Sequence, residues 1–485
     1  MDFFGARVTE KKTAIAAPVT AQTGAMAFGA APVHQVGGKV NEVVLAMTYA
    51  EAVEAVGYSD DWGKYPLCEV IYSHFRLYGV GPLLLVNVLD PSKHKSAAKS
   101  EEKTLTDGQI RISGETIPDT IKVELELPEE DGVSELETLV RGTDYDVFFE
   151  DGECVIEALA GGKLVSATAA IVTRNEVSFT LAELKDDVIG GYNVTTGKST
   201  GIELADQAYF KTKVLPSVLI APGFSDNSGV AAVLSAKAKS LSVVFRSFAI
   251  CDLTADSYQA AVTAKSGSGT FQNEKERLCW PMLGLDGRKY HFSTQVAGLM
   301  CALAANNRGI PSEPASNKTL QADSAILPDG TEVTLDLNQA NHLRGQGITT
   351  ALNFVNGFTA WGEYTACAPT NTDPKDASCN IAMMVNYIAN TVILTYWSYI
   401  DQKMTDRLAA SIADQINYWL NGLVNTGDLL GARCEVLAEE NPITDLMAGI
   451  VRVHIYMAVP GPAQQIDFVV EYDTSYVAAA FGVAG

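Results

Sequence analysis

Residues 214–251 decide the fold, and they read VLPSVLIA–PGFSDNS–GVAAVLSAKAKSL–SVVFRSFAIC. The apolar run Val214–Ala221 predicts a buried strand, and Val230–Leu241 has the apolar spacing of a helix. Val243–Cys251 predicts a second strand. A strand, a helix and a strand in this order form a right-handed crossover, so we expect the two strands to be parallel neighbours in one sheet.

Upstream, residues 41–91 have the same α/β character. Thr48–Val56 predicts a short helix, with Thr48 as its N-cap and Glu51 at the capping-box position. Pro82–Leu89 is a continuous apolar run of the kind that is buried on both faces of a parallel sheet. The two α/β segments therefore predict one core built from parts that are distant in the sequence.

The C-terminal third contains the clearest helix. Its apolar stripe recurs every four residues and consists of Ile400, Met404, Leu408, Ile412, Ile416 and Leu420. Thr405 is a plausible N-cap. Two strand-like runs follow, Ile450–Val459 and Ile466–Tyr472. Pro460-Gly-Pro462 separates them and makes a tight hairpin of the two runs unfavourable.

Residues 92–205 differ from their surroundings. Residues 101–157 contain 18 acidic and 4 basic residues, a net charge of −14. Ile121–Leu127 alternates between apolar and polar residues, and Val147–Ile156 predicts a hairpin around Asp151-Gly152. This pattern predicts an inserted β-rich domain whose outer face meets water, and solvation explains its charge better than a metal site does.

Composition excludes several classes of protein. The chain of 485 residues has 47% apolar residues, enough for cores, and a net charge of −23 that would be repelled by nucleic acid or an anionic membrane. No apolar run is long enough to span a bilayer. The eight cysteines form no C-x-x-C pair and predict buried free thiols. The small apolar stretch Ala14–Ala31 is interrupted by polar residues and Pro18, so we expect no signal peptide and a cytoplasmic site of synthesis.

Both ends of the chain lack a partner within their own segment. Residues 1–40 have no helical period and predict an extended N-terminal arm. The run Ile466–Tyr472 predicts a C-terminal strand. Unpaired strands add to exposed sheet edges, so two such ends would connect each chain to its neighbours. A heterologous contact of this kind produces a ring or a helical polymer.

Motifs for chemistry are weak. Gly197-Lys198-Ser199 resembles the end of a P-loop, but Tyr192 occupies the position of the first glycine. Ser225 follows a strand as a nucleophile would, yet Asn227 replaces the glycine that the sharp turn requires. Asp226, Asn227 and Ser228 are more simply explained as caps of the following helix. We therefore expect no catalytic residue, cofactor or metal. An α/β hydrolase-like enzyme that uses Ser225 or Asp252 is the alternative, and a surface-layer protein would need an export signal.

Several stretches, in their order along the chain, resemble the tail sheath proteins of contractile bacteriophage tails and related contractile injection particles. These stretches are Ile220–Gly223, Ala249–Asp252, Ala297–Leu299, Arg308-Gly309, Glu313–Asn317, Gly357–Gly362, Ile416–Leu423, Gly427, Leu430-Gly431, Glu440–Pro442, Gly449 and Pro460–Pro462. The resemblance covers about residues 40–90 and 205–475. Variable insertions on the outer face of sheath proteins fit the acidic segment between them.

The resemblance implies a structural protein. Its subunits would stack as six-fold rings around an inner tail tube, form a helical homopolymer, and contract to drive the tube through a target envelope. Further partners would be baseplate and tail terminator proteins, with no direct contact to nucleic acid and no membrane insertion. The protein would be a virion component that is assembled in the host cytoplasm. Strands donated between subunits would keep the polymer connected during contraction.

The implied organisation divides the chain into six parts. Residues 1–40 are an arm, 41–91 and 206–360 are the two parts of the α/β core, 92–205 is the outer insert, 361–460 is a domain facing the tube, and 461–485 is the second arm. The expected strand-exchange residues are Phe3, Phe4, Val8, Ile15, Val19, Val451, Val453, Ile455, Ile466, Phe468, Val470 and Tyr472. Lys403, Arg407 and Asp414 are the expected tube-facing residues.

Overall fold

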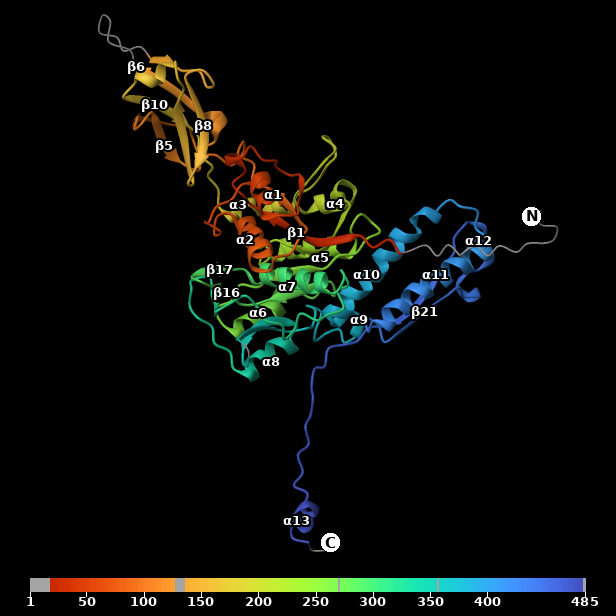
Figure 1. Cartoon of the computed structure of the whole chain (residues 1–485). Helices are drawn as coiled ribbons and strands as arrows, with labels where there is room; N and C mark the ends of the chain where they lie inside the picture. The colour runs from red at the N-terminus through yellow and green to blue at the C-terminus, as the bar shows by residue number, and fades with distance from the viewer. Residues whose placement is uncertain (1–17, 127–135, 269–270, 356, 483–485) are drawn as a thin grey trace, which may run out of the picture.

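The computed structural model of the chain describes residues 18–126, 136–268, 271–355 and 357–482. The fold is mixed α/β with several sheets, as predicted. A large sheet with its helices forms the centre of the molecule (Figure 1). A β-rich module lies at one end, and a largely helical C-terminal module lies on the other side.

The central sheet has eight strands in the order β2-β3-β1-β13-β14-β15-β19-β20. The six inner strands, from β3 to β19, are parallel, and the two edge strands are antiparallel to their neighbours. In sheet order the bounds are Val43–Ala46, Leu83–Asn87, Gln22–Gly29, Val214–Ile220, Ala249–Asp252, Glu276–Cys279, Ile348–Asn353 and Phe358–Trp361. The predicted parallel pairing of the strands around residues 214–251 is confirmed.

The prediction of an N-terminal arm that extends to residue 40 was wrong for β1. Gln22–Gly29 lies inside the sheet and pairs with both β3 and β13. Its small residues, which gave no recognisable period, allow close packing: a Cβ at Gly24 would lie 2.3 Å from the carbonyl oxygen of Pro82. The described chain is therefore part of the core from about residue 22 onward.

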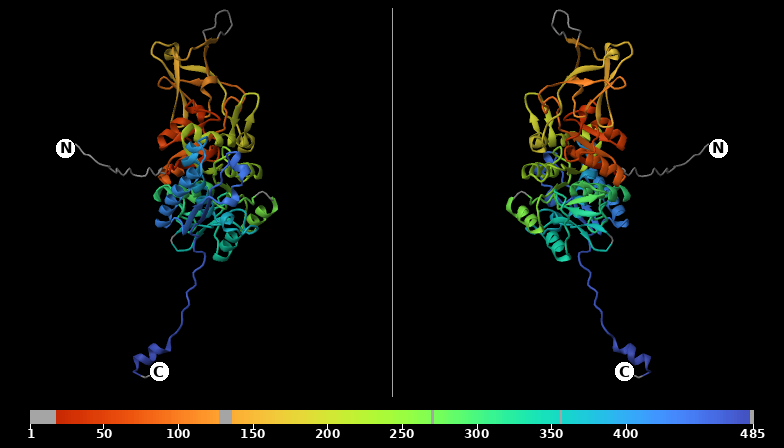
Figure 2. Two further views of the ribbon diagram at one scale, coloured as in Figure 1. Left: turned by 90° about the vertical axis from the view of Figure 1, so that its right-hand side faces the viewer. Right: turned by 90° about the vertical axis from the view of Figure 1, so that its left-hand side faces the viewer.

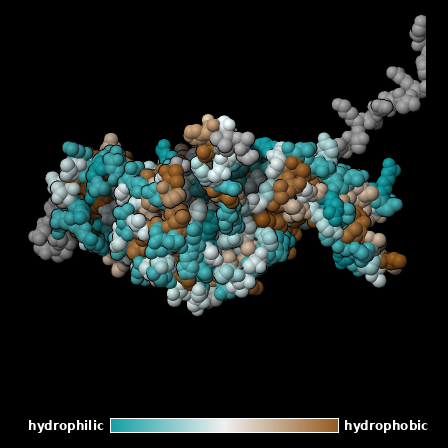
Figure 3. Space-filling view, turned by 90° about the horizontal axis from the view of Figure 1, so that it is seen from below, coloured by the Kyte–Doolittle hydropathy of each residue, from teal (hydrophilic) through white to brown (hydrophobic). Residues whose placement is uncertain are grey.

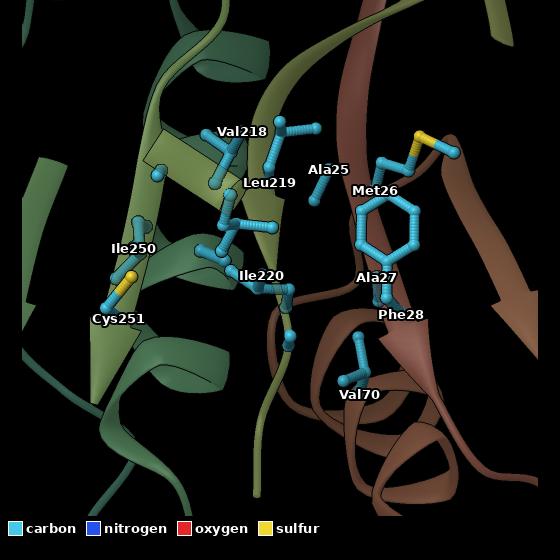
Figure 4. Packing of buried hydrophobic residues seen from close by; sticks show 14 of the residues in the cluster. Ala25, Met26, Ala27, Phe28, Val70, Val218, Leu219, Ile220, Ile250 and Cys251 are labelled. Carbon is cyan, nitrogen blue, oxygen red and sulfur yellow. The ribbon is translucent and has the colours of Figure 1, made fainter. Parts of the chain in front are cut away.

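Apolar side chains from the central strands fill the main core. Figure 4 shows Met26 and Phe28 of β1, Leu219 and Ile220 of β13, and Ile250 of β14 within this cluster. All five are fully buried. Each such side chain contributes roughly 1.5–3 kcal/mol to stability through burial, so the sheet is held mainly by its apolar residues.

Helices and short strands cover the central sheet. The helices are α1 Tyr49–Val56, α2 Pro66–Tyr72, α3 Leu181–Ile189, α4 Ala205–Thr212, α5 Ser228–Lys239, α6 Tyr258–Ser268, α7 Phe292–Asn306 and α8 Leu337–Gly345. A π-helical turn, Ser73–Leu77, extends α2. The small sheets are β11 Gly191–Asn193 with β12 Lys198–Thr200, and β17 Arg288–Tyr290 with β16 Met282–Leu285 and β18 Ser324–Ile326.

Helix α5 confirms the predicted crossover, and Asn227 is its N-cap, accepting a hydrogen bond from the Gly229 amide at 3.0 Å. The strand predicted over residues 243–251 is shorter than expected. Leu241 and Phe245 exchange both backbone hydrogen bonds in a tight turn, and β14 begins only at Ala249. Residues 243–245, whose apolar composition predicted a strand, are part of this turn instead.

The insert is a β module with its own apolar cluster, separate from the main core. One sheet has the order β4-β10-β6-β7, and the other has the order β5-β9-β8. Their bounds are β4 Lys99–Thr104, β10 Ala169–Arg174, β6 Lys122–Glu126, β7 Leu136–Thr138, β5 Gln109–Ser113, β9 Glu153–Ala158 and β8 Tyr145–Glu150. The predicted hairpin around Asp151-Gly152 is confirmed.

The predicted insert boundary of 92–205 was too long at its C-terminal end. Leu184 and Val188 of α3, and Ile202 and Leu204 after β12, belong to the main apolar core. The module itself is closed by the backbone pairing of Lys95 with Val177. The acidic composition ended near residue 157, but polar residues between 174 and 200 concealed where the core resumes.

A buried ion pair joins α2 to the start of α7. Glu69, which is 1% exposed, accepts hydrogen bonds from the His291 backbone amide and from its Nδ1, both at 2.7 Å. Burial alone would lower the pKa of His291, but the Glu69 carboxylate outweighs this and raises the pKa to about 9. The imidazolium is therefore the stable form at neutral pH.

This pair predicts a loss of stability in alkaline solution. A histidine whose pKa is higher in the folded than in the unfolded state contributes fully below about pH 6.5, and the contribution is lost as the pH rises through about 9. We expect the free energy of unfolding in urea to fall by about 3 kcal/mol over this window. In the double variant Glu69→Gln/His291→Asn this part of the slope should vanish, and an unchanged slope would contradict the assignment.

The separate apolar cluster predicts that the β module is dispensable for the core. Replacing residues 96–176 by two glycines joins Lys95 and Val177, which already lie side by side. We expect the remaining chain to fold, with slow amide exchange in β13, and residues 96–176 alone to give the circular dichroism of a folded β domain. An unfolded core after this deletion would show that the module is part of the core instead.

Candidate functional site

The C-terminal module is built on two long helices and a two-stranded sheet. The helices are α10 Cys379–Tyr396 and α11 Asp406–Asn425, preceded by the short α9 Pro374–Ala377. The strands are β21 Gly431–Glu435 and β22 His454–Ala458, with α12 Ile443–Met447 between them. The predicted start of this domain at residue 361 was too early, because Ala366 and Met383 still belong to the main apolar core. Helix α10 contributes to both apolar clusters, so the module is continuous with the core.

The predicted C-terminal helix is confirmed as α11, although it begins later than the apolar stripe. Thr405 is its N-cap and accepts a hydrogen bond from the Leu408 amide at 3.1 Å. Ile412, Ile416 and Leu420 are buried against α10 and the two strands. Ile400 and Met404 precede the helix and are exposed. Thr405 therefore marks where α11 begins, although the apolar spacing extends back to Ile400.

Three of the expected strand-exchange residues, Val451, Val453 and Ile455, lie in or just before the small sheet β21–β22. Ile455 is in β22, and Val451 and Val453 precede that strand. All three are half-buried, and Val453 and Ile455 pack against the module's apolar cluster. On the outer face, the Arg433 guanidinium lies 3.9 Å from the centre of the Tyr456 ring. Each strand pairs only with the other in the described chain, so both outer edges of the sheet are open.

The C-terminal segment leaves the body beside this module. Asn380 donates a hydrogen bond to the Pro460 carbonyl at 3.1 Å, and the Tyr364 hydroxyl donates one to Gln464 at 2.6 Å. Beyond these contacts the chain runs away from the body in every view and ends in the short helix α13 Thr474–Ala480 (Figures 1 and 2). The strand expected over Ile466–Tyr472 is not formed within this single chain.

Every residue from 466 to 472 is exposed, and Phe468 and Val470 are 86% and 94% exposed. In an extended strand, Ile466, Phe468, Val470 and Tyr472 would share one side. Hydrophobic residues are also visible on the surface of the C-terminal module (Figure 3). Exposed apolar groups of this extent indicate a surface that another chain covers.

Other expected site residues fall in different places. Phe3, Phe4, Val8 and Ile15 lie outside the described residues. Val19 is exposed, and its amide donates a hydrogen bond to Thr395 of α10 at 2.9 Å. Lys403, Arg407 and Asp414 are all exposed, and the last two lie on the outer side of α11.

Ser225 and Asp252 come together in the structure, but in a buried structural network. The Ser225 side chain is fully buried, and its hydroxyl donates to Asp252 at 3.3 Å. Asp252 also accepts hydrogen bonds from the Ser293 amide at 2.8 Å and the Ser293 hydroxyl at 2.5 Å. These bonds hold the N-terminal turn of α7 against β14. The hydroxyl that the enzyme alternative requires as a nucleophile is thus occupied and out of reach of a substrate.

Sequence reasoning missed Asp428, which joins the core to the C-terminal module. This side chain is 4% exposed and accepts hydrogen bonds from Ser312 at 2.6 Å, Arg308 at 2.9 Å, Asn307 at 3.0 Å and Thr426 at 2.5 Å. Burial alone would raise the pKa of Asp428, but these hydrogen bonds and the Arg308 charge lower it. Arg308-Gly309 and Gly427 were noted as separate motifs, and nothing in their spacing indicated that they meet.

Among the described residues, no three histidine, cysteine or acidic side chains are grouped as a metal site would require. Nor does any described helix combine the length and the apolar composition needed to cross a bilayer. The eight cysteines are free thiols, and all except the half-buried Cys301 are buried.

Comparison with known proteins identifies relatives along most of the chain. No protein-family model matches it. The chain is 25% identical over 413 residues to the tail sheath protein of Burkholderia phage BcepMu, covering 82% of this chain and 83% of that protein. It is also 25% identical over 312 residues to the major tail sheath protein of Serratia phage KSP20, covering 63% and 75%.

Solved structures agree at the level of the fold. The sheath complex of the extracellular contractile injection system PVC, in its contracted state, has a TM-score of 0.56 at 13% identity and covers 98% of this chain and 99% of that one. The helical sheath of the anti-feeding prophage in its contracted state has a TM-score of 0.55 at 12% identity, covering 98% and 100%. The sheath tail protein of Desulfitobacterium hafniense has a TM-score of 0.52 at 11% identity, covering 89% and 93%. The chain thus belongs to the tail sheath protein family of phages and contractile injection systems, as a structural subunit of a contractile tail sheath.

Proposed function

We propose that this subunit polymerises as stacked six-fold rings around an inner tail tube and contracts to drive that tube through a target cell envelope. The relatives include sheath proteins named from helical sheath and baseplate assemblies, which supports self-association and contact with a baseplate in a phage-like particle. A tail terminator protein would end the sleeve. The single observation that carries this proposal is the exposed, apolar C-terminal segment that follows a small sheet whose two outer edges are unpaired within the described chain.

Strand exchange between copies is the proposed connection. An added strand forms a row of backbone hydrogen bonds along the edge of β21 or β22. Ile466, Phe468 and Val470 would extend the apolar inner face that Ile455 and Met457 of β22 present to α11. A two-stranded sheet is marginal by itself, and a third or fourth strand from another chain would stabilise it. The N-terminal arm, mapped to residues 3–19, would be exchanged in the same way.

The remaining surfaces of the C-terminal module are assigned by the same reasoning. Lys403, Arg407 and Asp414 are exposed on α11 or just before it, and we assign them to the tube contact. The acidic β module at the opposite end of the molecule would then lie on the outer face of the sleeve (Figure 1). Its negative charge keeps neighbouring particles apart in solution.

Contraction requires each subunit to rotate as a body about its connecting strands. The Asp428 hydrogen bonds support this, because three donors at the end of α7, from Asn307, Arg308 and Ser312, fix the module to the core. The energy would come from the difference between two packings of the polymer. A bias of about a few kcal/mol per subunit is typical of two-state systems and adds up over many copies. No nucleotide is needed for such a mechanism.

The proposed strand exchange predicts a face-specific effect of mutations. Phe468→Asp should abolish assembly of sleeves, because an added strand would turn this side chain toward the apolar face. Val469→Asp, which is equally exposed in the single chain but faces the other side, should be tolerated. Negative-stain microscopy of the assembled sleeves is the measurement.

Deletion of residues 1–19 should also leave folded monomers. Sleeves that persist unchanged after that deletion would contradict the proposed strand exchange.

Removal of the Asp428 carboxylate predicts a loosened module. In Asp428→Ala four donors lose their acceptor, so we expect the free energy of unfolding to fall by about 2–4 kcal/mol. Amide exchange should become faster in β21, β22 and α11 than in β13. Glu439→Ala removes an exposed carboxylate from the same module and is the control. Equal exchange in the two variants would show that Asp428 does not hold the module in place.

A further inference from the structure

A groove of about 780 Å³ lies at the β20 edge of the central sheet, beside the point where the C-terminal segment leaves the body. Its lining includes Leu337 of α8, Phe354 and Val355 of the loop between β19 and β20, Trp361 of β20, and Gln464. None of the residues proposed for strand exchange or for the tube contact lines this groove.

The loop between β19 and β20 exposes two large apolar side chains. Phe354 and Val355 are 70% and 75% exposed, and Leu337 of α8 is 42% exposed. Polar residues and glycine ordinarily occupy such loops, because water surrounds them. The orientation of Trp361 is fixed, because its Nε1 donates a hydrogen bond to Asn341 at 3.0 Å. The groove is thus preformed and partly apolar, as a surface that another chain covers would be.

The groove also carries a positive charge. Of the described residues that line it, only Arg344 is charged, and its guanidinium lies 4.7 Å from the centre of the Trp361 ring. No carboxylate of the described residues forms an ion pair with Arg344, and the nearby Glu363 is already paired with Arg277 at 3.2 Å. Arg344 is half-buried, so salt screens its attraction for an anionic group less than at a fully exposed site. The groove therefore favours a ligand that has both apolar and acidic side chains.

Helix α13 presents an apolar face that the rest of the described chain leaves uncovered. Tyr476 and Ala480 are four residues apart, as are Val477 and Phe481, a spacing that places them on one side of a helix. Tyr476 and Phe481 are 76% and 79% exposed. A helix of seven residues is marginal by itself in water, because nucleation costs more than so few hydrogen bonds return. A second surface would stabilise α13.

The residues before α13 complement the charge of the groove. Asp467, Glu471 and Asp473 are all exposed, and residues 453–485 contain no lysine or arginine. Asp473 is also the N-cap of α13 and accepts a hydrogen bond from the Ser475 amide at 2.8 Å. The acidic charge is therefore gathered at the start of the helix, next to its apolar face.

The proposed strand exchange carries α13 of one copy toward the groove of another. In the small sheet, Gly431 of β21 lies opposite Ala458 of β22. A donated strand 466–472 that pairs antiparallel with β21, the more stable arrangement, ends at the Ala458 end of the sheet. From there the receiving chain reaches Gln464 in the groove within at most about 20 Å. Residues 473–481 of the donor, with α13 about 10 Å long, extend a comparable distance.

We infer that α13 of one copy docks in this groove on the copy that receives its strand, with Tyr476 and Phe481 against Trp361 and the acidic start of the helix near Arg344. The inference rests on the proposed strand exchange and adds a second contact to it. Backbone pairing alone specifies register weakly, and a slip of one residue would turn every side chain of the donated strand to the other face. The docked helix fixes that register.

A peptide of residues 466–482 tests the site on the full-length chain at monomeric concentration. Tyr476 of the peptide is replaced by p-benzoylphenylalanine, the peptide is added in excess, and the crosslinked products are mapped by mass spectrometry. We expect crosslinks to α8 and to the β19–β20 hairpin. Crosslinks confined to other surfaces, or none, would overturn the inference. So would crosslinks to the groove that appear only after residues 466–485 of the receiving chain are deleted, because its own end would then be the occupant.

Two pairs of variants provide matched comparisons. In the receiving chain, Val355→Asp should lower the yield of the groove crosslink about tenfold, because it places a charge against apolar side chains. Val243→Asp, at another turn of the core where the side chain is 89% exposed, should leave the yield unchanged. In the peptide, Phe481→Gln should lower the yield, and Ala479→Gln, off the apolar face, should not. Equal yields within either pair would contradict the docking.

Assembly separates this inference from the proposed function. Sleeves in which the same photoreactive group at position 476 gives no crosslink to the groove would refute the docked helix and leave the strand exchange standing. A chain whose groove captures the peptide, but which never forms sleeves, would instead refute the proposed function and leave the helix site standing.

Discussion

The pairing of β1 with both β3 and β13 holds the molecule together. These three parallel strands come from residues 22–29, 83–87 and 214–220, so one segment near the N-terminus joins two stretches that are more than 120 residues apart. Because the sheet is continuous across that gap, the chain between β3 and β13 can leave the core, form the acidic β module and return. The module's separate apolar cluster follows from this arrangement.

The same strand sets the positions of the chain ends. Since β1 begins beside α10, the preceding residues emerge next to the C-terminal module. The C-terminal segment leaves that module after Gln464. The described N-terminal residues thus leave the body beside Thr395, and the C-terminal segment leaves it beside Tyr364. The proposed strand exchange would connect copies of the chain from these two points.

The need for a hydrogen-bonding partner explains why the C-terminal segment has the sequence pattern of a strand but forms no strand in this single chain. Ile466–Tyr472 has the sequence pattern of a strand, but a strand needs an edge to pair with, and in this single chain the segment pairs with none. Its apolar side chains remain exposed until another chain covers them. Ser225 gives the opposite lesson, because a hydroxyl in a catalytic-looking position is buried and bonded to Asp252. Environment, and not residue type, decides what these groups can do.

Local patterns determined much of the protein. Thr48, Asn227 and Thr405 cap their helices, Asp151-Gly152 forms its hairpin, and the strands around residues 214–252 are parallel, because these features depend on neighbouring residues. The order of short motifs along the chain also indicated the family. Tertiary structure alone decided that the small residues 22–29 form a central strand, where close backbone packing replaces large side chains. It alone brought Asp428 to Arg308 and Ser312, and Gln464 to a groove beside Trp361, since contacts between distant segments follow from packing and leave no spacing in the sequence.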